Sequence, residues 1–107
     1  MSAVNAYLLS HRPEDADPLW YAPRIHCADG FNLSVQVHEC AYCCPRDGIG
    51  PDWSEAEIGF PSDRPNDAVM AYAEESDRPT DTVYSYVPMA LIDELVAAHG
   101  GIAKATP

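Results

Sequence analysis

The side chains with the most distinctive chemistry are four residues of types that can bind metal ions, all within seven positions: His38, Cys40, Cys43 and Cys44. The spacing of Cys40 and Cys43 is typical of one half of a structural zinc site. A tetrahedral site normally joins two such pairs. Cys27 is too far away to complete one, because it is expected beside a hairpin turn on the order of 30 Å from Cys40, at roughly 3.3 Å per strand residue. A zinc-stapled structural or adaptor domain using His38, Cys40 and Cys43 is therefore the alternative hypothesis, and the leading hypothesis involves no metal and no cofactor.

Catalysis by cysteine or by paired carboxylates has little support in the sequence. A reactive thiolate needs a neighbouring base and a positive local field, whereas Arg46 is the only cation near Cys43 and Cys44. Glu55 and Glu57 lack an accompanying histidine or metal motif, which is typical of a solvated face. We therefore expect a protein that is not an enzyme.

Negative charge is concentrated in one part of the chain. Acidic residues outnumber basic residues seventeen to six, and ten of the seventeen fall between Asp47 and Asp81, where only Arg64 and Arg78 oppose them. Such a surplus repels nucleic acid and anionic lipid, so the expected partner is a basic protein surface rather than DNA or a membrane. A purely solubilising role is the competing explanation of the charge.

The composition indicates one folded unit. A chain of 107 residues with 47% hydrophobic residues can bury a core. The sequence has neither a long apolar run for a membrane span nor a basic and apolar start for secretion. We expect a soluble, cytoplasmic protein, and its oligomeric state is open.

Two strands are expected to form a hairpin. Residues 24–27 and 31–38 flank Ala28-Asp29-Gly30, and Asp-Gly is a favoured hairpin turn. In the second run, apolar and polar side chains alternate, with Asn32, Ser34, Gln36 and His38 on the polar face. A third strand is predicted over 53–60, with Ser54, Ala56, Ile58 and Phe60 pointing inward and Glu55 and Glu57 outward.

The second half of the chain predicts two helices and one further strand. Asn66 is a candidate cap for a helix over 67–75, and residues 82–87 favour a strand. Pro88 can begin a final helix that Gly100-Gly101 ends, with one apolar stripe of Leu91, Ile92, Leu95 and Val96. The order β-β-β-α-β-α predicts an α+β fold, an antiparallel sheet of about four strands with helices packed on one face. Residues 1–18 are expected to form an N-terminal arm with weak structure, and 19–107 a single domain; whether the apolar part of the arm docks on this domain is left open by the sequence.

The acidic segment predicts a contact surface. Carboxylates held on a strand, its loops and a short helix can meet Lys and Arg side chains that otherwise grip phosphates, which imitates a nucleic-acid backbone. Exposed aromatics such as Trp53 or Tyr84 are expected to supply apolar anchoring. The expected partner-binding residues are Asp47, Asp52, Trp53, Glu55, Glu57, Asp63, Asp67, Glu74, Glu75 and Asp77.

Several segments resemble small proteins encoded by phages and prophages of proteobacteria. They are Arg24-Ile-His-Cys-Ala-Asp-Gly-Phe-Asn-Leu-Ser-Val-Gln36, Cys44-Pro-Arg-Asp47, Ile58-Gly-Phe-Pro-Ser62, and Tyr86-Val-Pro88 through His99-Gly-Gly101. The family has no settled reaction, cofactor or catalytic residue to transfer. Because small acidic phage proteins include anti-CRISPR inhibitors, the resemblance implies an inhibitor of a host defence complex, such as a Cas effector, in the host cell cytoplasm.

Overall fold

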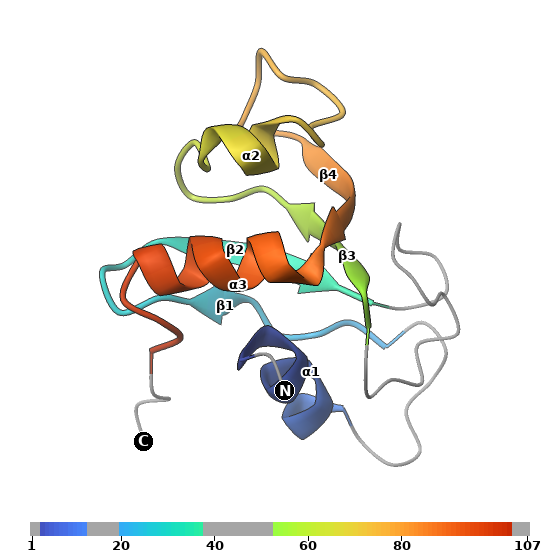
Figure 1. Cartoon of the computed structure of the whole chain (residues 1–107), viewed down its shortest axis with the longest axis vertical. Coiled ribbons are helices and arrows are strands. Elements are labelled where there is room, and N and C mark those ends of the chain that lie inside the picture. Colours follow the sequence, from blue (N-terminus) through green and yellow to red (C-terminus); the bar gives the residue numbers. More distant parts are fainter. Residues whose placement is uncertain (1–2, 13–19, 38–52, 104–107) are drawn as a thin grey trace.

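The computed structural model describes residues 3–12, 20–37 and 53–103. In this part of the chain the elements are α1 (Ala3–His11), β1 (Ile25–His26), β2 (Asn32–Gln36), β3 (Glu55–Gly59), α2 (Asp67–Met70), β4 (Val83–Pro88) and α3 (Met89–Ala98). The four strands form one antiparallel sheet in the order β1-β2-β3-β4, and α3 lies across one face of it between α1 and α2 (Figure 1). The predicted α+β class and four-stranded antiparallel sheet are confirmed. No helix within the described ranges is long and apolar enough to span a bilayer.

The hairpin of β1 and β2 forms where the sequence predicts it. The two strands pair around Gly30, whose φ of 98° is a conformation that other residues adopt only with strain. One residue departs from the expected alternation, because Gln36 is buried rather than on a polar face. Its side-chain amide accepts from the Ala22 N–H at 2.7 Å and donates to the Ala22 carbonyl at 3.0 Å. These two bonds tie the segment before β1 to the sheet.

The third strand is shorter than predicted. Ala56 and Ile58 are buried as expected. Ser54 and Phe60, both expected to point inward, are exposed because they lie beyond the two ends of β3. The register with β4 shifts between Ala56 and Ile58, and Tyr86 at this bulge has a φ of 53°.

Helix α2 ends earlier than the predicted helix over 67–75. The predicted cap is confirmed, since the Asn66 side chain accepts from the Val69 N–H at 3.0 Å. After Met70 the chain leaves the helix and runs along the edge of β4, where the Glu74 N–H donates to the Val83 carbonyl at 2.9 Å. Pairing with this strand edge replaces the last predicted helical turn.

Helix α3 supplies the main apolar layer over the sheet. Pro88 immediately precedes the helix, close to its predicted place in the first turn. A Cβ atom on Gly100, just beyond the helix, would lie 2.9 Å from the Ala28 Cβ, so the end of α3 approaches the β1–β2 turn closely. The predicted stripe along α3 includes three buried side chains, Ile92, Leu95 and Val96.

Helix α1 is part of the fold rather than a weakly structured arm. Val4 and Leu8 lie one turn apart on the same side of the helix and are completely buried. The Asn5 amide donates to the Trp53 carbonyl at 3.0 Å and accepts from the Trp53 N–H at 2.9 Å. The helix is further fixed to α3 because the Val4 N–H donates to Asp93 Oδ1 at 3.0 Å.

Candidate functional site

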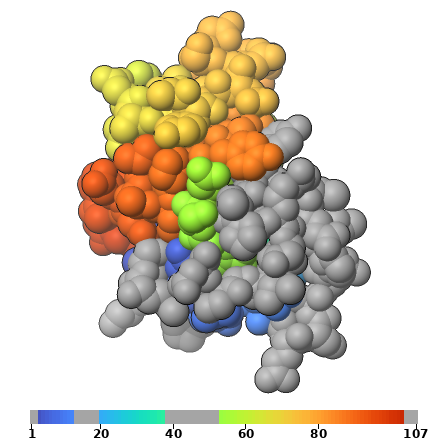
Figure 2. Space-filling model, turned by 45° about the vertical axis from the view of Figure 1, so that its right-hand side comes forward, coloured from blue at the N-terminus to red at the C-terminus, as the bar shows by residue number. Residues whose placement is uncertain are grey.

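The connection between β3 and β4, residues 61–82, carries six exposed carboxylates, and we call it the acidic lobe. Figure 1 shows α2 and the loop after it at one end of the molecule, away from α1. The lobe joins the sheet where Gly59 pairs with Val83 and the Phe60 N–H donates to the Thr82 carbonyl at 3.1 Å. In the space-filling view the lobe projects beyond α3 (Figure 2). Its carboxylates are therefore presented to solvent on a projection.

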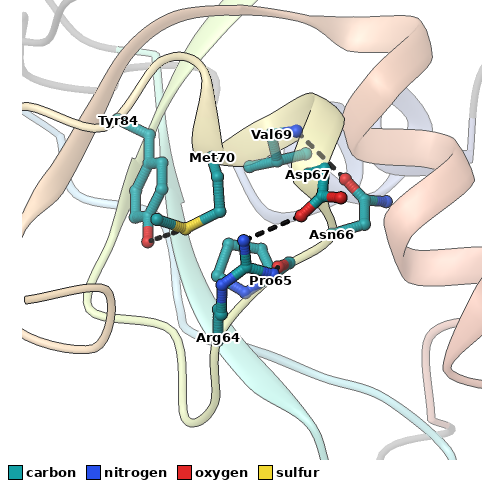
Figure 3. A network of polar contacts seen from close by, with 7 residues as sticks. All are labelled: Arg64, Pro65, Asn66, Asp67, Val69, Met70 and Tyr84. Atoms are coloured by element: carbon teal, nitrogen blue, oxygen red, sulfur yellow. Dashed lines mark hydrogen bonds and ion pairs between the residues drawn. The ribbon is translucent and has the colours of Figure 1, made fainter. Parts of the chain in front are cut away.

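The lobe is fixed to the sheet by Tyr84 of β4. The Tyr84 hydroxyl donates to the Pro79 carbonyl at 2.5 Å. It also contacts Met70 Sδ at 3.5 Å (Figure 3). Burial raises the pKa of Tyr84, and the positive charge of Arg64 opposes part of this rise. The hydroxyl therefore remains a donor at neutral pH and holds the loop after α2 against the helix.

Both arginines of the lobe are already paired within it. Arg64 Nη2 lies 2.7 Å from Asp67 Oδ1 (Figure 3), and Arg78 pairs with Asp81 in the same way, three residues along the chain. The Asp67 side chain is 93% exposed, so these pairs are of the surface type that contributes little to stability. The described structure shows no ion pair for the other four carboxylates, those of Asp63, Glu74, Glu75 and Asp77.

The structure gathers half of the ten expected partner-binding residues in the lobe. Glu55 and Glu57 lie instead on β3, where both are half-buried. Asp47 and Asp52 lie outside the described residues, as do the candidate zinc ligands His38, Cys40 and Cys43. The residues that the lobe brings together are Asp63, Asp67, Glu74, Glu75 and Asp77, together with Asp81.

The expectation that Trp53 or Tyr84 is an exposed anchor is wrong. Trp53 is 1% exposed and Tyr84 is completely buried. Asn5 holds the backbone of Trp53 against α1, and Tyr84 lies beneath the lobe, so neither ring can contact a partner. Phe60 is the exposed aromatic at the junction of sheet and lobe, with 49% of its surface accessible.

Phe60 is held in a strained backbone conformation. Its φ of 47° lies in the left-handed region, which costs a non-glycine residue about 1–2 kcal/mol. Both backbone groups are fixed, since the N–H donates to Thr82 and the carbonyl accepts from the Arg24 guanidinium. The Arg24 side chain is itself oriented by Asn32, whose Oδ1 accepts from Nε at 2.6 Å. Sequence reasoning missed Phe60 because it placed the ring inside a longer strand.

Comparing two substitutions separates this strain from the role of the ring. Phe60→Ala removes the ring and keeps the strain, whereas Phe60→Gly removes both. We expect the glycine variant to be more stable than the alanine variant by about 1 kcal/mol in urea denaturation. Equal stability of the two variants would show that the left-handed backbone carries no strain at this position.

A second polar cluster joins the β1–β2 turn to the end of α3. His99 Nδ1 lies 2.7 Å from Asp29 Oδ2, and the imidazole stacks on the Phe31 ring with centroids 4.0 Å apart. Hydrogen bonds from the Phe31 N–H and from His99 lower the pKa of Asp29. The carboxylate therefore remains ionised through the neutral and mildly acidic range.

The lowered pKa of Asp29 predicts a pH-dependent contribution to stability. Because the folded state favours the ionised carboxylate, the contribution is present above the ordinary pKa of about 3.9 and is lost as the pH falls through the lowered value. We expect Asp29→Asn to lower the melting temperature modestly at pH 7 and hardly at all at a pH well below the lowered pKa of Asp29. Equal losses at both pH values would contradict this account.

Within the described residues, the remaining candidate groups show no arrangement for metal or thiol chemistry. No set of three or more His, Cys, Asp and Glu side chains there is placed to hold a metal ion. Cys27 is buried, and desolvation together with the charge of Asp29 raises the pKa of its thiol. This environment disfavours the reactive thiolate.

The described arrangement is suited to electrostatic binding. It combines an exposed acidic projection, an exposed strained aromatic at its base and a cluster of carboxylate and imidazole beside it. Such a surface can attract and orient cationic side chains. Comparisons with protein-family models, curated proteins and solved structures found no match.

Proposed function

We infer that the protein is a non-enzymatic binding protein whose acidic lobe occupies a basic surface of a partner protein. The observation that supports this most strongly is the pairing within the lobe. Its two arginines are taken by Asp67 and Asp81, so they do not neutralise Asp63, Glu74, Glu75 and Asp77. The lobe therefore keeps a negative field that lysine and arginine side chains of a partner can complete.

Phe60 is the apolar anchor of this surface. Aromatic side chains at the centre of an interface contribute strongly to binding, and an aromatic face also attracts arginine and lysine. A strained backbone that exposes such a ring is typical of a functional position. Phe60 takes the role that the sequence assigned to Trp53 or Tyr84.

The specific form of the proposal is an anti-CRISPR inhibitor that occupies the DNA-binding surface of a Cas effector complex. The small size, the net charge of −11 and the resemblance to phage-encoded proteins support this form. In this role the lobe mimics the phosphate backbone, so the protein binds no nucleic acid itself. Inhibition requires only that the lobe and DNA compete for the same lysines and arginines.

A competition experiment tests this function. Labelled target DNA is incubated with a purified effector complex from a CRISPR-active host, and the protein is added in increasing amounts. We expect the protein to displace the DNA, with an efficiency that decreases as salt is added. If the complex retains its DNA at saturating protein, the anti-CRISPR form is wrong.

A further inference from the structure

We propose that a hollow beside the acidic lobe binds a single arginine side chain of the partner. This inference rests on the proposed function, because it assigns one cationic residue of the partner to one place on the surface. The hollow has a volume of about 280 Å³ and lies between the β1–β2 turn, the start of the lobe and the end of α3. Its lining consists of Asp29, Gly30, Phe31, Ser62, Asp63 and His99.

Backbone hydrogen bonds fix the three walls of the hollow relative to one another. The Ser62 N–H donates to the Asn32 carbonyl at 2.8 Å, and the Asn32 N–H donates to Ser62 Oγ at 2.9 Å. On the other side, the Asp29 N–H donates to the His99 carbonyl at 3.2 Å. Figure 1 shows α3 ending beside the β1–β2 turn. The hollow is therefore formed before any ligand arrives, which reduces the entropy cost of binding.

The polar groups of the hollow are mainly acceptors. Asp29 is held in one orientation, since Oδ1 accepts from the Phe31 N–H at 2.9 Å and Oδ2 lies 2.7 Å from His99 Nδ1. Asp63 Oδ1 accepts from the Arg64 N–H at 2.8 Å, which leaves Oδ2 to receive a donor. The end of α3 adds the negative pole of the helix dipole at the same place. These groups together favour a cation.

The arginine nearest in sequence does not fill the hollow. The Arg64 guanidinium bonds to the Pro65 carbonyl at 3.1 Å and to Asp67 at 2.7 Å (Figure 3). It is therefore engaged with the start of α2 rather than with Asp63. Among the residues that the structure describes, His99 is the only basic side chain that lines the hollow, and it pairs with Asp29.

The size and shape of the hollow favour arginine over other cations. Ligand pockets for small molecules usually measure about 300–1,000 Å³, so this volume suits one side chain better than a cofactor. A planar guanidinium can donate to Asp63 Oδ2 and at the same time lie flat against a ring such as that of His99. A lysine ammonium can donate in the same way but has no plane that can stack on the ring.

The test uses blocked tripeptides as probes, acetyl-Ala-Arg-Ala-amide and its lysine counterpart. Each is titrated into the full-length, ¹⁵N-labelled protein at constant ionic strength. We expect the arginine peptide to cause saturable shifts in the amide signals of Gly30, Ser62, Asp63 and His99, and the lysine peptide to bind several-fold more weakly. Asp63→Asn, which preserves the acceptor for the Arg64 N–H, should weaken binding of the arginine peptide about tenfold. Glu94→Gln removes one charge from an exposed position on α3, outside both the hollow and the lobe, and should change this affinity little.

The outcomes separate this inference from the proposed function. Absence of saturable shifts at the hollow, or equal weakening by Asp63→Asn and Glu94→Gln, would overturn the arginine site. The proposal that the acidic lobe binds a basic partner would still be supported if charge-reversed variants of the lobe lost their inhibition of the effector complex. Saturable binding at the hollow by a protein that displaces no DNA would reject the anti-CRISPR form of the proposed function and retain the arginine site.

Discussion

Replacing Asn5 by alanine is expected to lower the free energy of unfolding by about 2–4 kcal/mol. Asn5 is only 6% exposed, and its amide satisfies both the N–H and the carbonyl of Trp53. Each buried backbone group left without a partner costs about 1–3 kcal/mol. The loss also loosens α1 from the sheet, because Trp53 lies two residues before β3.

Urea denaturation measures this effect, with Ser10→Ala as the control on the same helix. Ser10 is exposed, and its hydroxyl bonds only locally, to the Tyr7 carbonyl and His11. The control should change stability by less than about 0.5 kcal/mol. An equally small effect of Asn5→Ala would mean that α1 is not an integral part of the fold.

Reversing three charges in the lobe is expected to reduce inhibition about 100-fold. The change is the triple substitution of Glu74, Glu75 and Asp77 by lysine, the three unpaired carboxylates that follow α2. Each reversal replaces an attraction to the basic partner by a repulsion, at about 1 kcal/mol per position, and these costs accumulate. The competition assay with labelled DNA measures the loss.

The fold should survive this change because the three side chains are exposed. Surface substitutions usually change stability by about 0.5 kcal/mol or less, so the melting temperature of the triple variant should stay near that of the wild type. A variant that keeps both its fold and its inhibition would exclude the lobe as the contact surface.

Local patterns were sufficient to predict the β1–β2 hairpin, helix α3 and the cap of α2. The alternation after Asp29-Gly30 predicted the hairpin, and the apolar stripe between Pro88 and Gly100 predicted α3. Asn66 was predicted as a cap because its side chain acts within one turn. Each of these features depends on residues close together in the sequence.

Features that depend on distant contacts could not be predicted. Trp53 is buried in the core, and Asn5, 48 positions earlier, binds its backbone. The left-handed conformation of Phe60 depends on Arg24, 36 positions before it. Glu74 leaves the helical path to pair with Val83, so α2 is short. Tertiary hydrogen bonding overrides local propensity in each case.

The candidate site was predictable in composition but not in shape. Asp63 to Asp81 remain together in space because they belong to one connection between β3 and β4. Glu55 and Glu57, although close in sequence, belong to the sheet itself. The hollow joins Asp29, Asp63 and His99 from three separate segments, and no sequence spacing indicates such a meeting.

The most direct test of the acidic lobe is a comparison of two single charge reversals. Glu75→Lys changes the lobe, and Glu94→Lys makes the same change of net charge at an exposed position on α3. The measurement is the displacement of DNA from the effector complex by each variant at low and at high salt. The lobe account predicts that Glu75→Lys weakens displacement several-fold at low salt, that Glu94→Lys stays close to wild type, and that the difference shrinks as salt is added. Equal effects of the two variants would contradict it and leave net charge, not the lobe, as the cause.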